Sequence, residues 1–210
     1  MIFLLPILVL YLFACPLSSS GAYDHGTSTG KGKLQIDLTW NPFNYFKNGQ
    51  SYVVLGYGLT NKLDLHGYYS DHGNYNNGVS SHYYGIFYQI HDSKHLDLST
   101  AIGKRKMADL EYNHIFFPQI LYNIKLNKGY TIGGSMVNVV SENYSIFRKT
   151  QSSWLTFDIA LFIPITKYIS KIKRIDEMKI GIGFFNNRLN KKNEASLFMP
   201  TYSIDIKLNI

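Results

Sequence analysis

The sequence predicts an all-β fold, a single antiparallel up-and-down β-barrel of about ten strands, with roughly eight to twelve possible. Two observations lead to this prediction. From Lys33 onward, apolar and polar residues alternate with a period of two, which is typical of strands with two unlike faces. Short and long connections also alternate along most of the chain, as in a barrel with short turns at one end and long loops at the other.

The composition limits the class of protein. The chain has 210 residues, of which 45% are hydrophobic, 15% aromatic and 17% charged, and its formal net charge is +7. This hydrophobic content, regularly patterned, excludes a disordered chain, and the length suits one domain. The single cysteine, Cys15, excludes an intrachain disulfide. No apolar stretch reaches the roughly 18 residues that a membrane-spanning helix needs.

The first 22 residues are expected to be a cleavable signal peptide. Residues 2–14 form an apolar run, and Ser20 and Ala22 occupy the −3 and −1 positions of a signal-peptidase cut. A second interpretation stays open, because residues 12–15 (LFAC) resemble a lipobox in which Cys15 would be acylated. Residues 23–32 are predicted to be a flexible periplasmic lead, and residues 33–210 the barrel.

Ten segments show the alternation, and no segment is convincingly helical. They are 33–41, 51–59, 63–70, 82–90, 95–103, 115–126, 130–140, 153–164, 177–185 and 201–210. In the first segment, for example, Leu34, Ile36 and Leu38 alternate with polar residues. The weakest is 130–140, where Gly133 and Gly134 predict a β-bulge.

The connections between these segments predict which end of the barrel is which. Those at 60–62, 91–94 and 127–129 are tight, whereas 42–50, 71–80, 104–114, 141–152 and 186–200 are expected to be long polar loops. Residues 165–176 break the rule, and the near-helical spacing of their isoleucines leaves open a short amphipathic segment or an ordinary loop.

Alternation alone does not decide which face of the barrel is apolar, since a soluble lipocalin-like barrel alternates in the same way. Two features favour an apolar outer face. Aromatic residues of the apolar face fall toward the two strand ends, as in the interfacial girdles of a transmembrane barrel. They are Trp40, Tyr69, Tyr84, Phe116, Phe184 and Tyr202 toward the long loops, and Tyr57, Tyr88, Tyr122 and Tyr130 toward the short turns or the middle. Glycines such as Gly56 and Gly58 lie on the polar face, and a narrow lumen needs such small residues.

Together, the export signal, an even number of amphipathic strands and a final strand at 202–210 that runs to the terminus resemble small bacterial outer-membrane β-barrel proteins. The resemblance covers residues 33–210 and is architectural. Members of this family usually end in an aromatic residue, whereas this chain ends in Ile210.

The resemblance implies an outer-membrane location with both termini in the periplasm, and as partners the barrel-assembly machinery, outer-membrane lipids and lipopolysaccharide. Cationic residues of the expected outer loops could meet lipopolysaccharide phosphates or draw anionic solutes toward the mouth of the barrel. They are Lys104, Arg105, Lys106, Arg148, Lys149, Arg188, Lys191 and Lys192. Solvated loop charge that aids solubility is the other interpretation.

The lumen offers the residue types of a hydrolase without its motif. His66, Ser70, His95 and Asp97 would face inward on the third and fifth strands, and a nucleophile, a base and a carboxylate are what such catalysis needs. A hydrogen-bonded polar filling is the simpler interpretation. The sequence predicts no metal site and no cofactor, and the export signal argues against a nucleic-acid partner.

The sequence therefore predicts a non-enzymatic outer-membrane barrel with a structural or interaction role, or a narrow pore for small solutes. An outer-membrane lipid-modifying enzyme and a secreted, soluble lipocalin-like binding protein are the alternatives. The transported solute and the oligomeric state are not predicted by the sequence.

Overall fold

The computed structural model describes residues 25–41, 50–71, 80–107, 113–114, 119–145, 148–169, 173–186 and 198–210. It is built almost entirely of strands. They are β1 (Lys33–Asn41), β2 (Gln50–Gly58), β3 (Leu63–Asp71), β4 (Ser80–Asp92), β5 (Leu96–Met107), β6 (Asn113–His114), β7 (Gln119–Lys125), β8 (Thr131–Ser145), β9 (Arg148–Pro164), β10 (Ile175–Asn186) and β11 (Phe198–Asn209). All pairings between them are antiparallel.

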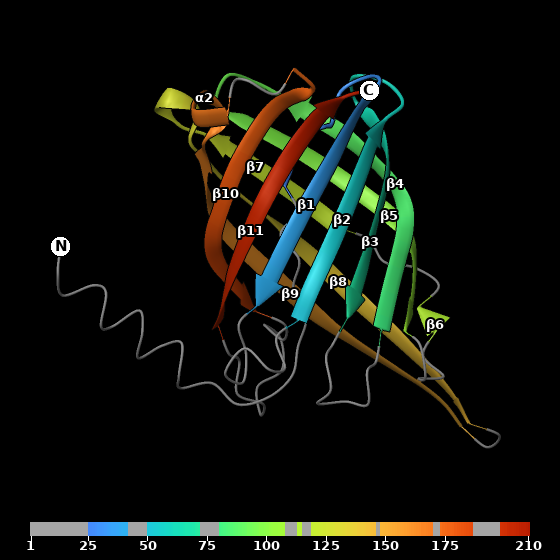
Figure 1. Ribbon diagram of the computed structural model, residues 1–210. Coiled ribbons are helices and arrows are strands. Elements are labelled where there is room, and N and C mark those ends of the chain that lie inside the picture. The colour runs from blue at the N-terminus through green and yellow to red at the C-terminus, as the bar shows by residue number, and fades with distance from the viewer. Residues whose placement is uncertain are drawn as a thin grey trace, which may run out of the picture.

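Ten strands close into the barrel that the sequence predicts (Figure 1). Strands adjacent in the chain pair with each other, β5 pairs with β7, and β1 pairs with β11 to complete the ring. The short β6 lies outside this count, because it only extends the end of β5 opposite Arg105 and Lys106. Each of the ten predicted segments coincides with one barrel strand, so the period-two pattern located them correctly.

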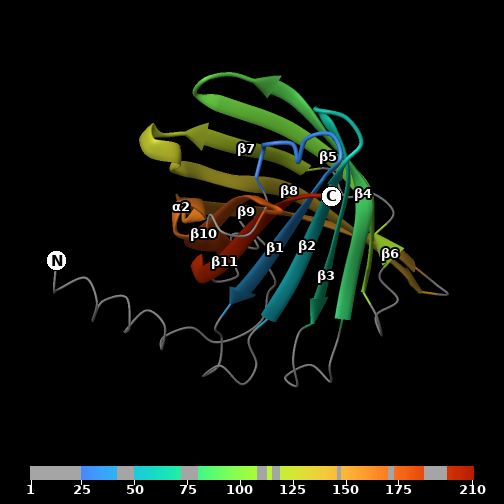
Figure 2. The ribbon, with the colours of Figure 1, turned by 45° about the horizontal axis from the view of Figure 1, so that its top comes forward.

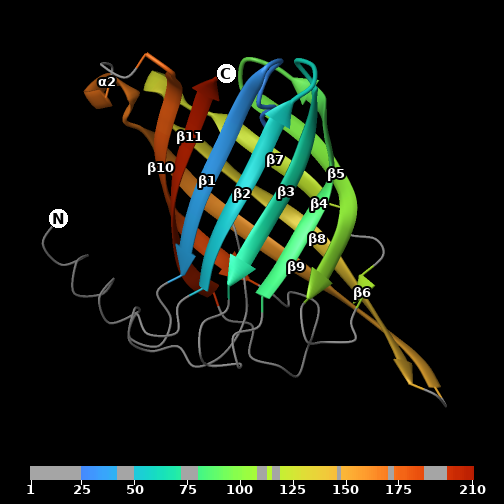
Figure 3. The same cartoon turned by 45° about the vertical axis from the view of Figure 1, so that its right-hand side comes forward.

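Strands extend furthest into two of the expected long loops, 141–152 and 104–114. Residues 141–145 and 148–152 pair with each other as the tip of a β8–β9 hairpin that projects well past the other strands at the long-loop end (Figure 3). Residues 104–107 belong to β5, so the cationic run from Lys104 to Lys106 lies on a strand instead of in a loop, as do Arg148 and Lys149 on β9. The cationic residues Arg188, Lys191 and Lys192 lie outside the described residues.

The bulge predicted at Gly133 and Gly134 is absent. Gly133 lies opposite Ala160 and Met136 opposite Phe157, so the register of β8 against β9 is the same before and after this point. The ladder instead lacks the pairings of Gly134 and Ser135. Register shifts occur elsewhere, near the short-turn ends of β4 and β10.

The apolar face of the barrel points outward. Leu55 and Ile86 are 46% and 49% exposed, whereas the neighbouring lumen-facing Val54 and Phe87 are each 3% exposed. Carboxylates such as Asp64, Asp97 and Asp158 are buried inside the barrel. This confirms the predicted orientation of the two faces, and it is the reverse of the apolar interior that a soluble lipocalin-like barrel requires.

Aromatic side chains of the outer face lie toward the two ends of the strands, as expected. Trp40 and Tyr202 are neighbours at the long-loop end, with ring centroids 6.4 Å apart. Tyr69, Tyr84 and Phe184 are exposed toward the same end, and Tyr57, Tyr88 and Tyr130 toward the other. Phe116 lies outside the described residues.

The connection between β9 and β10 contains one turn of helix, α2 (Thr166–Ile169). The Thr166 hydroxyl accepts a hydrogen bond from the backbone N–H of Met178 at 2.8 Å, which ties this turn to the start of β10. Tyr168 projects outward and is 76% exposed. A second, shorter helical turn, η2 (Asn127–Gly129), joins β7 to β8. In the described part of the chain, no helix is long and apolar enough to cross a membrane.

The predicted signal peptide, the cut after Ala22 and the alternative acylation of Cys15 lie outside the described residues.

Candidate functional site

The lumen is the candidate site, because the polar faces of all ten strands converge there. Strand alternation directs these side chains inward, and most are almost fully buried. They include Gln35, Asp37, Asp64, His66, Ser70, Gln89, Asp97, Ser99, Asn123, Ser135, Asp158, Lys179, Ser203 and Asp205. Buried polar groups need hydrogen-bond partners, so the content of the lumen determines whether this arrangement is stable.

Part of that content is the N-terminal segment, residues 25–32. It lies inside the barrel near the short-turn end, and Figure 2 shows it in blue within the ring of strands. His25, Ser28 and Thr29 are only 7%, 8% and 4% exposed. The sequence predicted a flexible lead at this position, but the segment is ordered by contacts with the barrel wall.

The segment folds back from β1 on a turn containing two glycines. Gly30 and Gly32 have φ angles of 89° and 72°, which are strained for residues with a Cβ. Within the turn, the N–H of Lys33 donates to the carbonyl of Gly30, and the N–H of Gly32 donates to the carbonyl of Gly58 at 2.8 Å. The turn thus attaches the segment to the end of β2 and directs it into the lumen.

On one side, β3 and β4 bind the main chain of the segment. The N–H of Thr29 donates to Asp64 Oδ2 at 2.7 Å, and the N–H of Ser28 donates to Gln89 Oε1 at 3.1 Å. The Ser28 hydroxyl donates to the carbonyl of Asn61, in the tight turn between β2 and β3, at 2.7 Å. Residues from two strands and a turn therefore bind two consecutive residues of the segment.

On the other side, β5 and β7 bind the next part of the segment. The Thr27 hydroxyl donates to Asp97 Oδ2 at 2.7 Å and accepts a hydrogen bond from Asn123 Nδ2. The Ser99 hydroxyl donates to the carbonyl of Gly26 at 2.6 Å. Asp97 and Ser99 are fully buried, so water does not reach them, and the segment supplies hydrogen-bond partners in its place.

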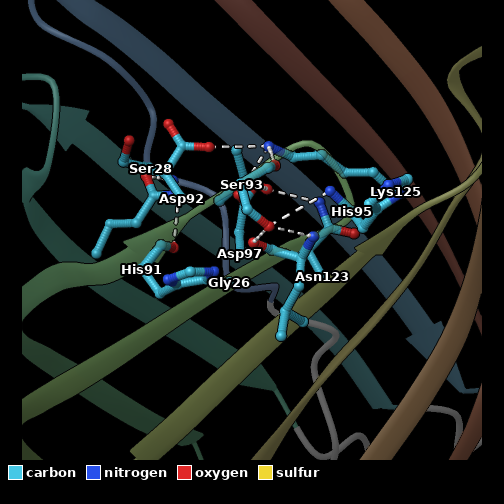
Figure 4. A network of polar contacts seen from close by, with 12 residues as sticks. Gly26, Ser28, His91, Asp92, Ser93, His95, Asp97, Asn123 and Lys125 are labelled. Atoms are coloured by element: carbon cyan, nitrogen blue, oxygen red, sulfur yellow. Dashed lines mark hydrogen bonds and ion pairs between the residues drawn. The ribbon is translucent and has the colours of Figure 1, made fainter.

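Lys125 joins this network to the rim of the barrel (Figure 4). Its ammonium lies 2.7 Å from the buried Asp97 and 3.0 Å from the exposed Asp92, and it also donates to the carbonyl of Ser93 at 2.9 Å. Asp92 ends β4 beyond the apolar part of the outer face, and its hydrogen bond with Lys125 holds the pKa of the Asp92 carboxyl below its usual range.

The third side of the segment faces β1, β9 and β11. His25 Nε2 lies 2.8 Å from Gln35 Nε2, and its ring packs edge-on against Phe162. Lys207 Nζ donates to the carbonyl of Ser28 at 3.4 Å. A cavity of about 10 Å³, enough for about one water molecule, remains here. It is lined by His25, Gln35, Glu177, Lys179, Asp205, Ile206 and Lys207.

Toward the long loops, aromatic rings occupy part of the lumen. Tyr68 stacks on Tyr83 with centroids 5.4 Å apart, and Tyr52 packs edge-on against Tyr68 at 6.1 Å. His66 lies below them, 5.4 Å from the ring of Tyr83 and 6.0 Å from that of Phe87. The His66 imidazole is thus packed among rings.

The structure does not bring the four candidate catalytic residues together. His66 is level with Gly85 and Gly103, whereas Asp97 lies about 20 Å further along β5 toward the short turns. Ser70, on the same strand as His66, is about 13 Å away in the opposite direction. His95 is exposed in the turn before β5 and does not face the lumen, because β5 begins only at Leu96.

The interacting residues that the sequence did not reveal are those of the segment itself. Small polar residues such as Thr27, Ser28 and Thr29 are typical of linkers, and their partners lie far away in the sequence. The glycines on the lumen face of β2 are the sequence feature that could have indicated that another part of the chain approaches this strand closely. Among the described residues, no group of three or more His, Cys, Asp or Glu is placed to hold a metal ion.

The fold and lumen together define a closed, ten-stranded antiparallel β-barrel with a polar interior that residues 25–32 partly occupy. No family model matches the sequence, and no curated protein matches it. A similar solved structure is the N-terminal β-barrel domain of Pseudomonas aeruginosa OprF. The two are 10% identical with a TM-score of 0.34, over 85% of this chain and 98% of that one.

Proposed function

We propose that this chain is a bacterial outer-membrane β-barrel with a structural or interaction role, and that its lumen is closed to solutes. The outward apolar face is the observation that carries the proposal. Ile86, Ile120 and Leu65 would each leave a large apolar side chain in water if the barrel were soluble, since they are 49%, 59% and 49% exposed. A lipid environment buries them, and a closed barrel leaves no unpaired strand edge in the lipid.

The contents of the lumen support a role other than that of an open pore. Residues 25–32 contact the wall on several sides at the short-turn end, and the aromatic rings around Tyr83 occupy part of the lumen beyond them. Ten strands enclose a lumen that side chains can largely fill. The narrow pore expected as the other possibility would need this segment to move.

The proposed role is non-enzymatic, because His66, Ser70, His95 and Asp97 lie too far apart to act on one substrate atom. The proposed partners are outer-membrane lipids, lipopolysaccharide and the barrel-assembly machinery. Lys104 supports the lipopolysaccharide contact, since it is exposed on the outer wall beside Tyr84, toward the long-loop end.

The first experiment locates the protein and tests for the barrel. Cells expressing the chain are separated into inner-membrane, outer-membrane and periplasmic fractions, and each fraction is run in SDS with and without boiling. We expect the protein in the outer-membrane fraction, with a band whose mobility changes on boiling. A soluble periplasmic protein without a mobility change would contradict the proposal.

The second experiment tests whether the lumen is closed. The purified protein is reconstituted into planar lipid bilayers, and single-channel current is recorded in a salt solution. We expect no current steps from protein that shows the mobility change on boiling. Regular current steps would instead establish the narrow pore.

A further inference from the structure

The wall of the lumen binds residues 25–32 mainly through their backbone. Asp64 and Gln89 accept hydrogen bonds from the N–H groups of Thr29 and Ser28, and Ser99 donates to the carbonyl of Gly26. These interactions would form with any residue type whose backbone took this path. The wall therefore recognises the path of the main chain more than particular side chains.

The wall is also shaped to admit that main chain closely. A Cβ on Gly58 would overlap the carbonyl oxygen of Gly30, and one on Gly56 would lie 2.8 Å from Thr29 Oγ1. Both glycines lie on the lumen face of β2, where a larger side chain would push the segment away. The absence of side chains at these two positions thus leaves the space into which the backbone of the segment fits.

The segment also has a small residue where it lies against the wall. A Cβ on Gly26 would lie 2.8 Å from both the carbonyl oxygen of Leu121 and the Cα of Tyr122, so only glycine fits against β7 at this point. The next residue, Thr27, uses its hydroxyl to bind both Asp97 and Asn123. A glycine followed by hydroxyl residues is therefore the kind of sequence that the site selects.

If the segment left, two buried carboxylates of the lumen would lose hydrogen-bond donors. Asp64 is 3% exposed and Asp97 is fully buried, and both accept hydrogen bonds from the segment. Asp97 would keep the Lys125 ammonium, but each carboxylate would lose a donor. Buried carboxylates that lack donors are costly, so the empty site would favour the entry of a chain that donates to them.

We propose that the short-turn half of the lumen is a peptide-binding site for a glycine- and hydroxyl-rich chain that follows the path of residues 25–32. The protein's own residues 25–32 occupy it. The site binds the same class of peptide from solution when that segment is not in place. This inference goes beyond the proposed function and does not depend on it, because binding is measured on the folded barrel in detergent micelles whatever membrane it comes from.

The test uses the full-length chain with the substitution Gly26→Leu, which prevents its own segment from occupying the site. The probe is an acetylated synthetic peptide of residues 25–32 (HGTSTGKG) with fluorescein at its C-terminus. Binding is followed by fluorescence anisotropy in detergent micelles. We expect saturable binding to the Gly26→Leu barrel, at least tenfold tighter than to the wild-type barrel, in which the attached segment competes at high effective concentration.

Two matched controls test the specificity of this binding. A peptide carrying leucine in place of Gly26, with its other two glycines unchanged, should bind the Gly26→Leu barrel at least tenfold more weakly than the natural peptide. The full-length variant Lys31→Ala, altered at an exposed side chain of the turn, should bind the peptide no better than wild type does.

Folding of each variant is checked by its mobility change on boiling. If Gly26→Leu does not fold, Thr27→Val replaces it, because this variant removes the hydroxyl that binds Asp97 and Asn123 while keeping the side-chain volume. The inference is overturned if a folded variant does not bind the peptide. It is equally overturned if wild type binds as tightly as the variant, or if both peptides bind alike.

Discussion

Two side chains replace missing backbone hydrogen bonds in the wall between β8 and β9. Where the ladder lacks the pairings of Gly134 and Ser135, the N–H of Ser135 donates to Asp158 Oδ1 at 2.6 Å, and the Ser135 hydroxyl donates to Oδ2 at 2.7 Å. The Tyr122 hydroxyl donates to the carbonyl of Asp158 at 3.0 Å. In a membrane these substitutes matter, because no water is available for the freed backbone groups.

Removing the Tyr122 hydroxyl should therefore weaken the barrel. We expect Tyr122→Phe to lower the free energy of unfolding by about 1–2 kcal/mol, since the carbonyl of Asp158 loses its donor. The measurement is urea unfolding of the reconstituted protein, followed by loss of the unboiled mobility. Tyr130→Phe is the matched control, because Tyr130 is an exposed tyrosine of the outer face whose hydroxyl makes no hydrogen bond with the residues that the structure describes. An equal loss in both variants would contradict this role for Tyr122.

At the scale of elements, one cation connects β4, β5 and β7 to the N-terminal segment. Lys125 ends β7, pairs with Asp97 on β5 and with Asp92 on β4, and Asp97 in turn binds Thr27. Because Asp97 is fully buried, this ammonium and the donors of the segment are the partners that stabilise its carboxylate. The order of the segment is thus coupled to the pairing of the strands around it.

The substitution Lys125→Met should leave Asp97 without its cation. We expect the free energy of unfolding to fall by about 2–3 kcal/mol, the usual cost of removing one partner from a buried charged hydrogen bond. The same urea experiment measures it. Lys94→Met, at an exposed position in the turn between β4 and β5, should change stability by less than about 0.5 kcal/mol. A loss at Lys125 no larger than at Lys94 would show that Asp97 does not need the cation.

For the whole molecule, the proposed outer-membrane location depends on the apolar outer face of the barrel meeting lipid. Ile86, in the middle of β4, points outward between Leu65 of β3 and Ile102 of β5. All three are large apolar side chains that are nearly half exposed. A charge at such a position would be forced into the apolar interior of the bilayer.

Ile86→Arg should therefore destabilise the barrel in lipid vesicles by about 2–4 kcal/mol. Reversible folding into vesicles, measured across a urea series, gives this value. Tyr168→Arg provides the comparison, since Tyr168 lies on α2, outside the barrel wall, and should cost much less. Equal effects of the two substitutions would argue that Ile86 does not lie in the apolar layer.

The sequence predicted the barrel well because strand position and facing depend on local alternation. Leu34, Ile36 and Leu38 needed no distant information to be placed on one face. The lumen segment was not predicted, since the roles of Thr27 and Thr29 depend on Asp97 and Asp64, which are 70 and 35 residues away.

The β8–β9 hairpin was mistaken for a loop for a related reason. Its polar residues from Ser141 onward show no apolar face, although their backbones pair regularly with the opposite strand. The irregularity at Gly134 was noticed, but its form depends on Asp158, which lies on another strand. The irregularity is therefore an interruption of the strand pairing and not the predicted bulge.

The pairing that closes the ring has a consequence for rearranging the gene. Lys33, the first residue of β1, lies directly opposite Asn209, the last residue of β11 (Figure 1). The start and end of the barrel are therefore neighbours, and a circular permutant could join them and open the chain at the turn 60–62 with every strand pairing preserved. If the joining linker includes residues 25–32, this segment is attached to a barrel strand at both of its ends.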